Sequence, residues 1–305
     1  MHIIEPDATT LHGYFSNERA PILTIESGEM VRYRTLAANW SEVQDGKLVR
    51  LPVREQDPLQ GHGMCGPIVI NGAKKGMVLE VQIGDIVPAT KGYNRGGGSS
   101  MHVFQWMGTT DGEPHLMDWT IDVAAGTATA ATGHSVRISP FMGVMGIAPA
   151  EAGQHDTAPP RNVGGNLDCK ELIAGTSLYL PIAVDGALFS VGDGHARQGD
   201  GEISGTAIEC PMERVDLTFI VHEEMALTTP AAQTAEGWIT FGFSEDLDEA
   251  ANIACNAMLD TIMKDYSVSR QVALALASVV VDLRVTQIVN GVKGVHAVLP
   301  HGALF

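Results

Sequence analysis

Short β-prone runs separated by turn residues constrain the fold of this chain more than any other feature. The clearest runs are residues 22–25, 30–36, 48–53, 68–70, 77–87, 117–123, 135–138, 177–184, 203–208 and 214–222. Their length and the Gly, Asn and Asp residues between them are typical of antiparallel sheets. Alternating strand and helix units would instead indicate a doubly wound sheet or an α/β barrel. We expect a mainly β protein with a β-sandwich-like core of the jelly-roll type.

The pattern changes after Gly242, where two helices are expected. Ser244 suits the N-cap of the first, because acidic residues follow it directly. Apolar residues then recur at helical spacing, namely Leu247, Ala251, Ala254, Met258 and Ile262. The second helix is expected to begin near Ser267 or Ser269 and to be followed by a strand at 283–289. These two helices and the strand form a smaller α+β part.

The element pattern divides the chain into three regions. Residues 1–135 are expected to form a β-rich N-terminal domain, and residues 136–243 a β-rich region that carries the catalytic motifs. Residues 244–305 would form the α+β part that packs on the β core. Within the middle region, residues 140–165 are expected to be mostly loop. Residues 92–100 contain too few apolar side chains to predict an element.

Composition excludes several classes of function. A formal net charge of −17, from 19 basic and 36 acidic residues, opposes nucleic-acid binding. No apolar run approaches the roughly 20 residues of a membrane-spanning helix, and the N-terminus carries no leader pattern. The four cysteines lack metal-type spacing, so a reducing cytoplasmic location is expected. With 45% hydrophobic and 18% charged residues, the chain is apolar enough to predict a homo-oligomer.

Residues 192–202, GDGHARQGDGE, are the strongest candidate for chemistry. They place Asp193, His195, Asp200 and Glu202 among glycines, which allow sharp turns. Carboxylates around an imidazole suit a divalent cation, zinc first and calcium as the alternative. Asp168 lies upstream in GGNLDCK. We expect the strand-like run 177–190 to form a hairpin that brings Asp168 to the same end as the 193–202 loop.

Five segments of the chain resemble the acetamidase/formamidase family of amide hydrolases. They are GPIVINGA (66–73), SPFMGVMGIAP (139–149), PPRNVGGNLDCKEL (159–172), LYLPIAVDGALFSVGDGHARQGDGEISGTAIE (178–209) and VVVDLRVTQIVNGVKGVHAVLP (279–300). The resemblance implies a β-sandwich-rich fold, an oligomer, a divalent metal and hydrolysis of a short aliphatic amide to a carboxylate and ammonia. One turn departs from the family: this chain reads GAKKGM at 72–77, where members tend to read GAEPGD.

The residues and the resemblance together give a working hypothesis for the site. Asp168, His195 and Glu202 are predicted to hold the metal. Glu202 is also predicted to move a proton as general base and then general acid, with Asp193 as a second catalytic residue. The predicted substrate contacts are His62, His102 and Asn166. The partner is a small amide, and no nucleic acid or membrane is expected.

Three other interpretations remain. GGGSS, residues 96–100, is similar to the Gly/Ser-rich stretch of serine amidases but lacks the glycine that follows the serines in that pattern. Cys169, Lys170 and Glu171 are the residue types of thiol amidases, although three adjacent side chains are expected to diverge. The chain could instead be a β-sandwich binding protein without amidase activity, with calcium held by Asp193, Asp200 and Glu202. Near the C-terminus, Asp282 and Arg284 are expected to form a structural ion pair.

Overall fold

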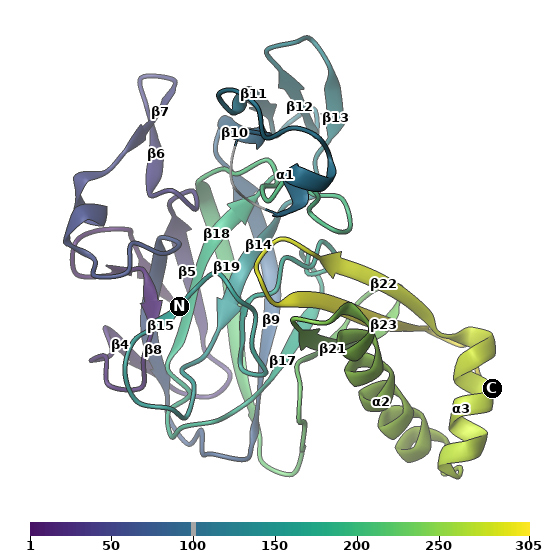
Figure 1. The fold of residues 1–305 in the computed structure, drawn as a ribbon. Helices are drawn as coiled ribbons and strands as arrows, with labels where there is room; N and C mark the ends of the chain where they lie inside the picture. Colours follow the sequence, from purple (N-terminus) through teal and green to yellow (C-terminus); the bar gives the residue numbers. More distant parts are fainter. Residues whose placement is uncertain (99–101) are drawn as a thin grey trace.

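The computed structural model describes residues 1–98 and 102–305 and consists mainly of strands (Figure 1). Its largest sheet has nine strands. Neighbouring strands are antiparallel, except that the two at the N-terminal edge, β1 and β5, are parallel. In spatial order the strands are β1 (His2–Ile4), β5 (Met30–Thr35), β19 (Met212–His222), β9 (Val78–Pro88), β17 (Ser177–Pro181), β20 (Ala231–Gln233), β21 (Gly237–Ser244), β23 (Lys293–Pro300) and β22 (Asp282–Gln287).

A six-stranded sheet packs against the nine-stranded one. The two sheets share one hydrophobic core, in which the rings of Phe189 and Phe219 lie 4.9 Å apart between centroids. Burial of apolar side chains from both sheets is the main force that holds such layers together. The strands of the six-stranded sheet are β16 (Gly164–Asn166), β14 (Phe141–Gly146), β18 (Phe189–His195), β8 (Met64–Ile70) and β2 (Leu11–His12), with β4 (Leu23–Ile25) alongside β8.

Smaller elements surround one end of this sandwich. Figure 1 shows a hairpin, β6 and β7, and a four-stranded sheet, β10 to β13, projecting at the same end of the molecule. The described residues also form a short 3-10 helix, a short α-helix and one further strand pair. Their bounds are β6 (Ser41–Gln44), β7 (Lys47–Arg50), η1 (Pro52–Gln56), β10 (Lys91–Gly96), α1 (His102–Trp106), β11 (His115–Asp122), β12 (Thr127–Ala130), β13 (Ser135–Arg137), β3 (Tyr14–Phe15) and β15 (His155–Asp156).

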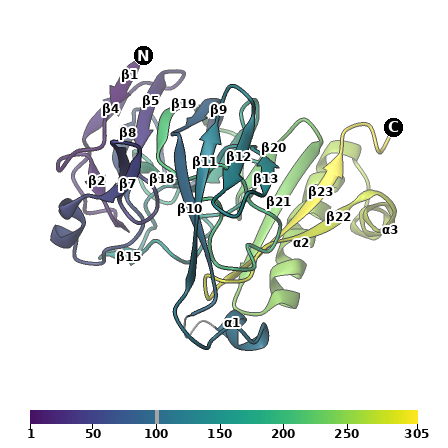
Figure 2. The ribbon, with the colours of Figure 1, turned by 90° about the horizontal axis from the view of Figure 1, so that it is seen from above.

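Two helices near the C-terminus, α2 (Leu247–Tyr266) and α3 (Arg270–Val280), cover the β21–β23 end of the large sheet, as predicted. The termini lie at opposite sides of the molecule (Figure 2). The N-cap of α2 is Asp246, whose carboxylate accepts a hydrogen bond from the Glu249 amide at 3.0 Å. The predicted cap, Ser244, is wrong by two residues, because its hydroxyl instead donates to the Glu249 carboxylate. Ser269 caps α3, as predicted. No helix in the described part of the chain has the length and apolarity needed to cross a membrane.

Several predicted element boundaries are wrong. Residues 140–165 contain β14 and β16, whose glycines and complete burial hide the alternating pattern that usually marks a strand. Residues 92–100 include most of β10. The run 48–53 divides between β7 and η1, because Pro52 suits the start of a helix. Residues 203–208 are a turn rather than a strand, with Gly205 at a φ of 67°.

The predicted hairpin over residues 177–190 is also wrong. β17 belongs to the nine-stranded sheet and β18 to the six-stranded one, so the chain crosses between layers there. Strand β14 instead brings the two segments together, because it pairs with β16 on one side and β18 on the other. The nine-stranded sheet takes strands from all three predicted regions. The division into those regions stays a prediction.

Candidate active site

A cavity of about 690 Å³ opens at the end of the sandwich. Hairpin β6–β7 and strands β10 and β11 supply much of its wall. Acidic side chains from two loops and a buried strand reach its floor. The polar residues along it include His62, Tyr93, Asn166, Asp193, Glu202, Glu209 and Asn290. The cavity therefore contains most of the residues that the sequence singled out, together with Glu209, which it did not.

Strand β18 places Asp193 on the floor and His195, which is fully buried, directly beside it. Two residues apart on a strand, their side chains are expected on one face, and the imidazole Nε2 of His195 lies 3.2 Å from Asp193 Oδ1. The same Nε2 lies 3.3 Å from Oε2 of Glu209. The backbone of Glu209 forms bridges to both Tyr93 and His195, which fixes its position between β10 and β18. Glu209 is the last residue of the family-like segment 178–209, and this is the signal by which it could have been found.

Asp168 follows the end of β16 and is buried next to the floor residues, without itself lining the cavity. The amides of Leu167 and Asp168 both donate to the carbonyl of Gly143, at 2.9 and 3.2 Å. The Asn290 side chain donates to Asp168 Oδ2 at 2.7 Å, and the Gln198 side chain donates to the Asp168 carbonyl, also at 2.7 Å. Asp168 is thus held by β14, by the 192–202 segment and by the loop after β22.

Glu202 lies in the turn that follows β18. The preceding Gly201 donates to the carbonyl of Thr286 at 3.0 Å and accepts from Ile288 at 3.2 Å, so this turn is attached to the end of β22. Asp168, Asp193 and Glu202 all have positive φ, at 49°, 59° and 45°. Non-glycine residues adopt this conformation rarely and at an energetic cost, and such residues cluster at functional sites.

The side chains that the sequence grouped together converge in space. Ligand atoms of Asp168, Asp193 and His195 lie within 4.8 Å of one another, as do those of His195, Glu202 and Glu209. We call these five residues the acidic cluster. Asp200 is not part of it, because its carboxylate pairs with Lys170 at 2.5 Å. The proposed calcium site of Asp193, Asp200 and Glu202 is therefore not assembled as a group in this structure.

The close approach of the cluster to β14 depends on a glycine. A Cβ added at Gly143 would lie 2.4 Å from Asp193 Oδ2, 2.7 Å from His195 Cε1 and 2.8 Å from Asp168 Oδ1. Real Cβ atoms are not found at such distances, and the contacted atoms are buried. The missing side chain at residue 143 therefore provides the space in which three members of the cluster meet.

Several polar atoms of the cluster are buried and have no hydrogen-bond partner among the described residues. They are Asp168 Oδ1, Asp193 Oδ1, Glu209 Oε2 and both ring nitrogens of His195. Leaving buried polar atoms unpaired costs free energy, and native proteins rarely do so without a reason. A divalent cation would satisfy oxygen and imidazole donors together. The donor set therefore fits a metal ion.

The pKa values in the cluster show strong coupling between its charges. Burial raises the pKa of Asp168 to about 8 and that of Glu202 well above its ordinary value, and it also raises the pKa of Glu209. Burial alone would lower the pKa of His195, but the carboxylates of Asp193 and Glu209 outweigh it and raise that pKa. The imidazole in turn holds the pKa of Asp193 below its usual range against the effect of burial. Such a cluster carries shared protons unless a cation replaces them.

The predicted substrate contacts have different outcomes. Asn166 lines the cavity, its amide donates to the carbonyl of Ala158 at 3.0 Å, and its Oδ1 is unpaired. His62 also lines the cavity, with Nδ1 2.8 Å from the hydroxyl of Thr157. His102 begins helix α1, but its side chain lies outside what the structure describes, as do Ser99 and Ser100 of the GGGSS segment. The roles of all these residues stay predictions.

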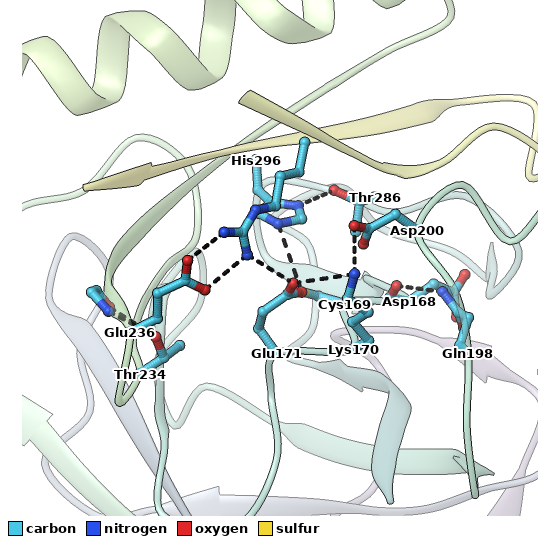
Figure 3. A network of polar contacts seen from close by, with 12 residues as sticks. Asp168, Cys169, Lys170, Glu171, Gln198, Asp200, Thr234, Glu236, Thr286 and His296 are labelled. Carbon is cyan, nitrogen blue, oxygen red and sulfur yellow. Dashed lines mark hydrogen bonds and ion pairs between the residues drawn. The ribbon is translucent and has the colours of Figure 1, made fainter. Parts of the chain in front are cut away.

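A network of charged side chains lies beside the cluster (Figure 3). At its centre is Glu171, whose carboxylate contacts Cys169 Sγ at 3.3 Å, Lys170 Nζ at 3.7 Å and His296 Nε2 at 3.6 Å. The expectation that residues 169–171 diverge is therefore wrong. The thiol of Cys169 is nevertheless fully buried, and burial raises its pKa well above the ordinary value, which opposes a role as nucleophile.

The network also corrects the predicted ion pair near the C-terminus. Arg284 lies on β22 and pairs with Glu236, and it contacts Glu171 at 3.3 Å. Asp282, two residues away on the same strand, forms no ion pair among the residues described. The guanidinium thus joins β22 to the segment that carries Asp168, and the network ties the C-terminal strands to the site.

The charge of Glu171 is expected to stabilise the fold. Burial alone would raise its pKa, but contacts with His296 and then Lys170 outweigh burial and lower that pKa from 4.5 to about 2. A lowered folded-state pKa gives stability that is present above pH 4.5 and is lost as the pH falls towards 2. We expect Glu171→Gln to flatten the decline in unfolding free energy over this range, measured by urea denaturation at several pH values. The exposed Glu223→Gln variant is the control, and an unchanged decline in Glu171→Gln would contradict the prediction.

The turn that departs from the family pattern lies away from the cavity. Lys74 pairs with Asp185 at 3.1 Å, and the amide of Lys75 donates to the same carboxylate. Gly72 and Gly76 have φ values of 81° and 92°, as expected for a tight turn. No residue of 72–77 belongs to the cavity lining among the described residues. This turn is therefore held by its contacts with Asp185 and lies outside the cavity wall.

The chain belongs to the acetamidase/formamidase family, whose model matches residues 3–153 and 150–302. An acetamidase from Bacillus halodurans has a similar structure, with 28% identity, a TM-score of 0.85, and coverage of 98% of this chain and 97% of that one. A predicted acetamidase/formamidase from Thermoanaerobacter tengcongensis gives 27% identity and a TM-score of 0.85 over 100% and 99% of the two chains. A provisionally named formamidase of Schizosaccharomyces pombe is 27% identical over 235 residues, which are 59% of this chain and 56% of that protein. The chain thus matches little more than half the length of this curated relative.

Proposed function

We propose that this protein is a metal-dependent hydrolase that cleaves the C–N bond of a short aliphatic amide. The products would be a carboxylate and ammonia. The observation that supports this most is the acidic cluster, five buried titratable side chains, of which three line the floor of an open cavity and four carry buried atoms without a hydrogen-bond partner among the described residues. Membership of the acetamidase/formamidase family supports the same reaction class.

Asp168, His195 and Glu202 are the proposed metal ligands, and the geometry adds Asp193 and Glu209 as further donors. An imidazole among carboxylates favours zinc, because calcium prefers oxygen ligands alone. Calcium is the alternative. A bound divalent ion would polarise the amide carbonyl and make water a better nucleophile at neutral pH. Asp168 Oδ1 and His195 Nδ1, which have no hydrogen-bond partner among the described residues, support this assignment, as does His195 Nε2, whose contacts are limited to two carboxylates of the cluster.

The remaining chemistry falls to side chains of the cluster. Glu202 faces the cavity, and burial raises its pKa well above the ordinary value, which suits a group that accepts and returns a proton. Glu202 would take a proton from the attacking water and pass it to the leaving nitrogen as the C–N bond breaks. Asp193 would hold the His195 ring in place through the contact at 3.2 Å. Glu209 shares the floor and is the alternative proton carrier.

Ammonia release tests the proposal directly. Purified protein would be incubated with formamide, acetamide and propionamide, before and after treatment with a chelator, and then with zinc or calcium added back. We expect release that the chelator abolishes and that one ion restores. Release that is unaffected by complete removal of metal would reject the metal dependence. The absence of release from every amide, with metal bound, would favour a binding protein on the same fold.

Two further expectations stay predictions. The cytoplasmic location has no structural test. The homo-oligomer is consistent with apolar side chains exposed on α3, where Leu274 is 59% and Val279 83% exposed. Light scattering of the purified protein would give the oligomeric state.

A further inference from the structure

The cavity above the acidic cluster is much larger than a formamide or acetamide needs. Its volume is about 690 Å³, whereas a water molecule takes roughly 30 Å³ of liquid and an amide of three or four heavy atoms on the order of 100 Å³. The wall that encloses the remaining space comes from β7, η1 and β10. These elements contribute three arginines, Arg50, Arg54 and Arg95.

Two of these arginines have unused bonding capacity. Arg50, at the end of β7, is exposed and forms no ion pair or side-chain hydrogen bond within the described ranges. Arg54, in η1, donates from one terminal nitrogen to the carbonyl of Gln60 at 3.0 Å, but its Nε is buried without a partner. A guanidinium offers five donors in a planar fork that fits a carboxylate. An arginine without a carboxylate partner at a cavity wall is therefore available to an anionic ligand.

The charges of the cavity are separated along its depth. The floor carries Glu202, Glu209 and Asp193 of the acidic cluster. Tyr93 connects the two groups, because its backbone forms a bridge to Glu209 and Arg95 lies two residues further along the same strand. Two acidic residues, Asp118 and Asp156, share the wall with the three arginines. A ligand whose two ends differ in charge would therefore meet carboxylates at the floor and arginines at the wall.

We propose that the substrate is a primary amide that also bears a carboxylate, such as the half-amide of a short dicarboxylic acid. This inference rests on the proposed function. The amide end would lie on the floor, at the proposed metal site, and the carboxylate would pair with Arg50 and Arg54 on the wall. Water adds to the amide carbon, the C–N bond breaks, and nitrogen leaves as ammonia. The products are a dicarboxylate and ammonium. In a chain with a net charge of −17, unpaired arginines are the local attraction such a substrate requires.

Three amides of similar shape test the charge preference. Succinamate carries a carboxylate, 4-methylpentanamide is its neutral counterpart, and 3-aminopropanamide carries an ammonium group. We expect kcat/KM for succinamate to exceed that for the neutral amide by at least tenfold, mainly through KM. The preference should decrease at about 0.5 M salt, because screening weakens attraction at an open cavity wall.

Variants then locate the preference. In the double variant Arg50→Gln/Arg54→Gln, the ratio of kcat/KM for succinamate to that for 4-methylpentanamide is expected to fall at least tenfold. The control variant Arg137→Gln also removes an arginine charge, but from β13, outside the cavity lining, and should leave that ratio unchanged. Calorimetric binding of succinate, the product, gives a second readout that does not depend on turnover. We expect the double variant to raise its Kd about tenfold.

The outcomes separate this inference from the proposed function. Hydrolysis of acetamide and 4-methylpentanamide without any preference for succinamate would overturn the inference and leave the amidase proposal standing. A preference for succinamate that the double variant retains would overturn the assignment to Arg50 and Arg54. No hydrolysis of any amide by metal-loaded protein would overturn both proposals together.

Discussion

On the proposed function, a His195→Ala variant is expected to lose most of the bound divalent metal and at least a thousandfold of the amide turnover. Nε2 of this fully buried ring lies 3.2 Å from Asp193 and 3.3 Å from Glu209, and both ring nitrogens lack other partners. Removing the imidazole leaves carboxylates that repel one another, and it deletes the one nitrogen donor that favours zinc over calcium. Metal content by mass spectrometry and ammonia release would be measured on the same preparation.

The matched control is His115→Ala, which removes an exposed histidine from β11. Circular dichroism would check that both variants remain folded. If His195→Ala kept its metal and its turnover, the assignment of the acidic cluster as the metal site would be wrong. If turnover alone were lost, His195 would contact substrate rather than metal.

Gly143→Ala is expected to disrupt the site as severely as the loss of a ligand, although residue 143 carries no functional group. The added methyl would lie 2.4 Å from Asp193 Oδ2 and 2.8 Å from Asp168 Oδ1, so at least one carboxylate must move. Misplacing a ligand by about 1 Å commonly costs two orders of magnitude in rate. We expect a fall of at least a hundredfold in turnover, weaker metal binding and a lower melting temperature.

Gly96→Ala on β10 is the control, because a Cβ at residue 96 meets open space. The metal affinity of both variants would be compared by competition with a chromogenic chelator. Wild-type affinity and turnover in Gly143→Ala would show that the three side chains do not need their observed close approach.

The sequence predicted the composition of the site better than its construction. The metal-competent residues of the two glycine-rich segments can be identified directly from the sequence. In the structure they do converge, as Asp168, Asp193, His195 and Glu202. The route by which they converge could not be read. It depends on β14, a strand whose burial on both faces removes the alternation that sequence patterns detect.

Residues that act through long-range contacts were also missed. Glu209 contacts His195 because its backbone forms bridges to both β10 and β18. The Asn290 side chain donates to Asp168 although the two residues are 122 positions apart in the sequence. The N-cap of α2 was misplaced because Ser244 and Asp246 are both good capping residues and only the backbone conformation selects one. Element types were therefore predicted more reliably than the tertiary contacts that assemble the site.

The order of strands in the nine-stranded sheet has a consequence for how the protein is made. Its first edge, β1, is synthesised before every other strand of the sheet, whereas the opposite edge, β22, is made after every strand of the sheet except β23. Gly201 of the cluster turn and Asp168 both bond to residues between 286 and 290. A nascent chain that has not yet reached residues 286–290 therefore cannot form these contacts, so the complete site forms only after that segment has emerged.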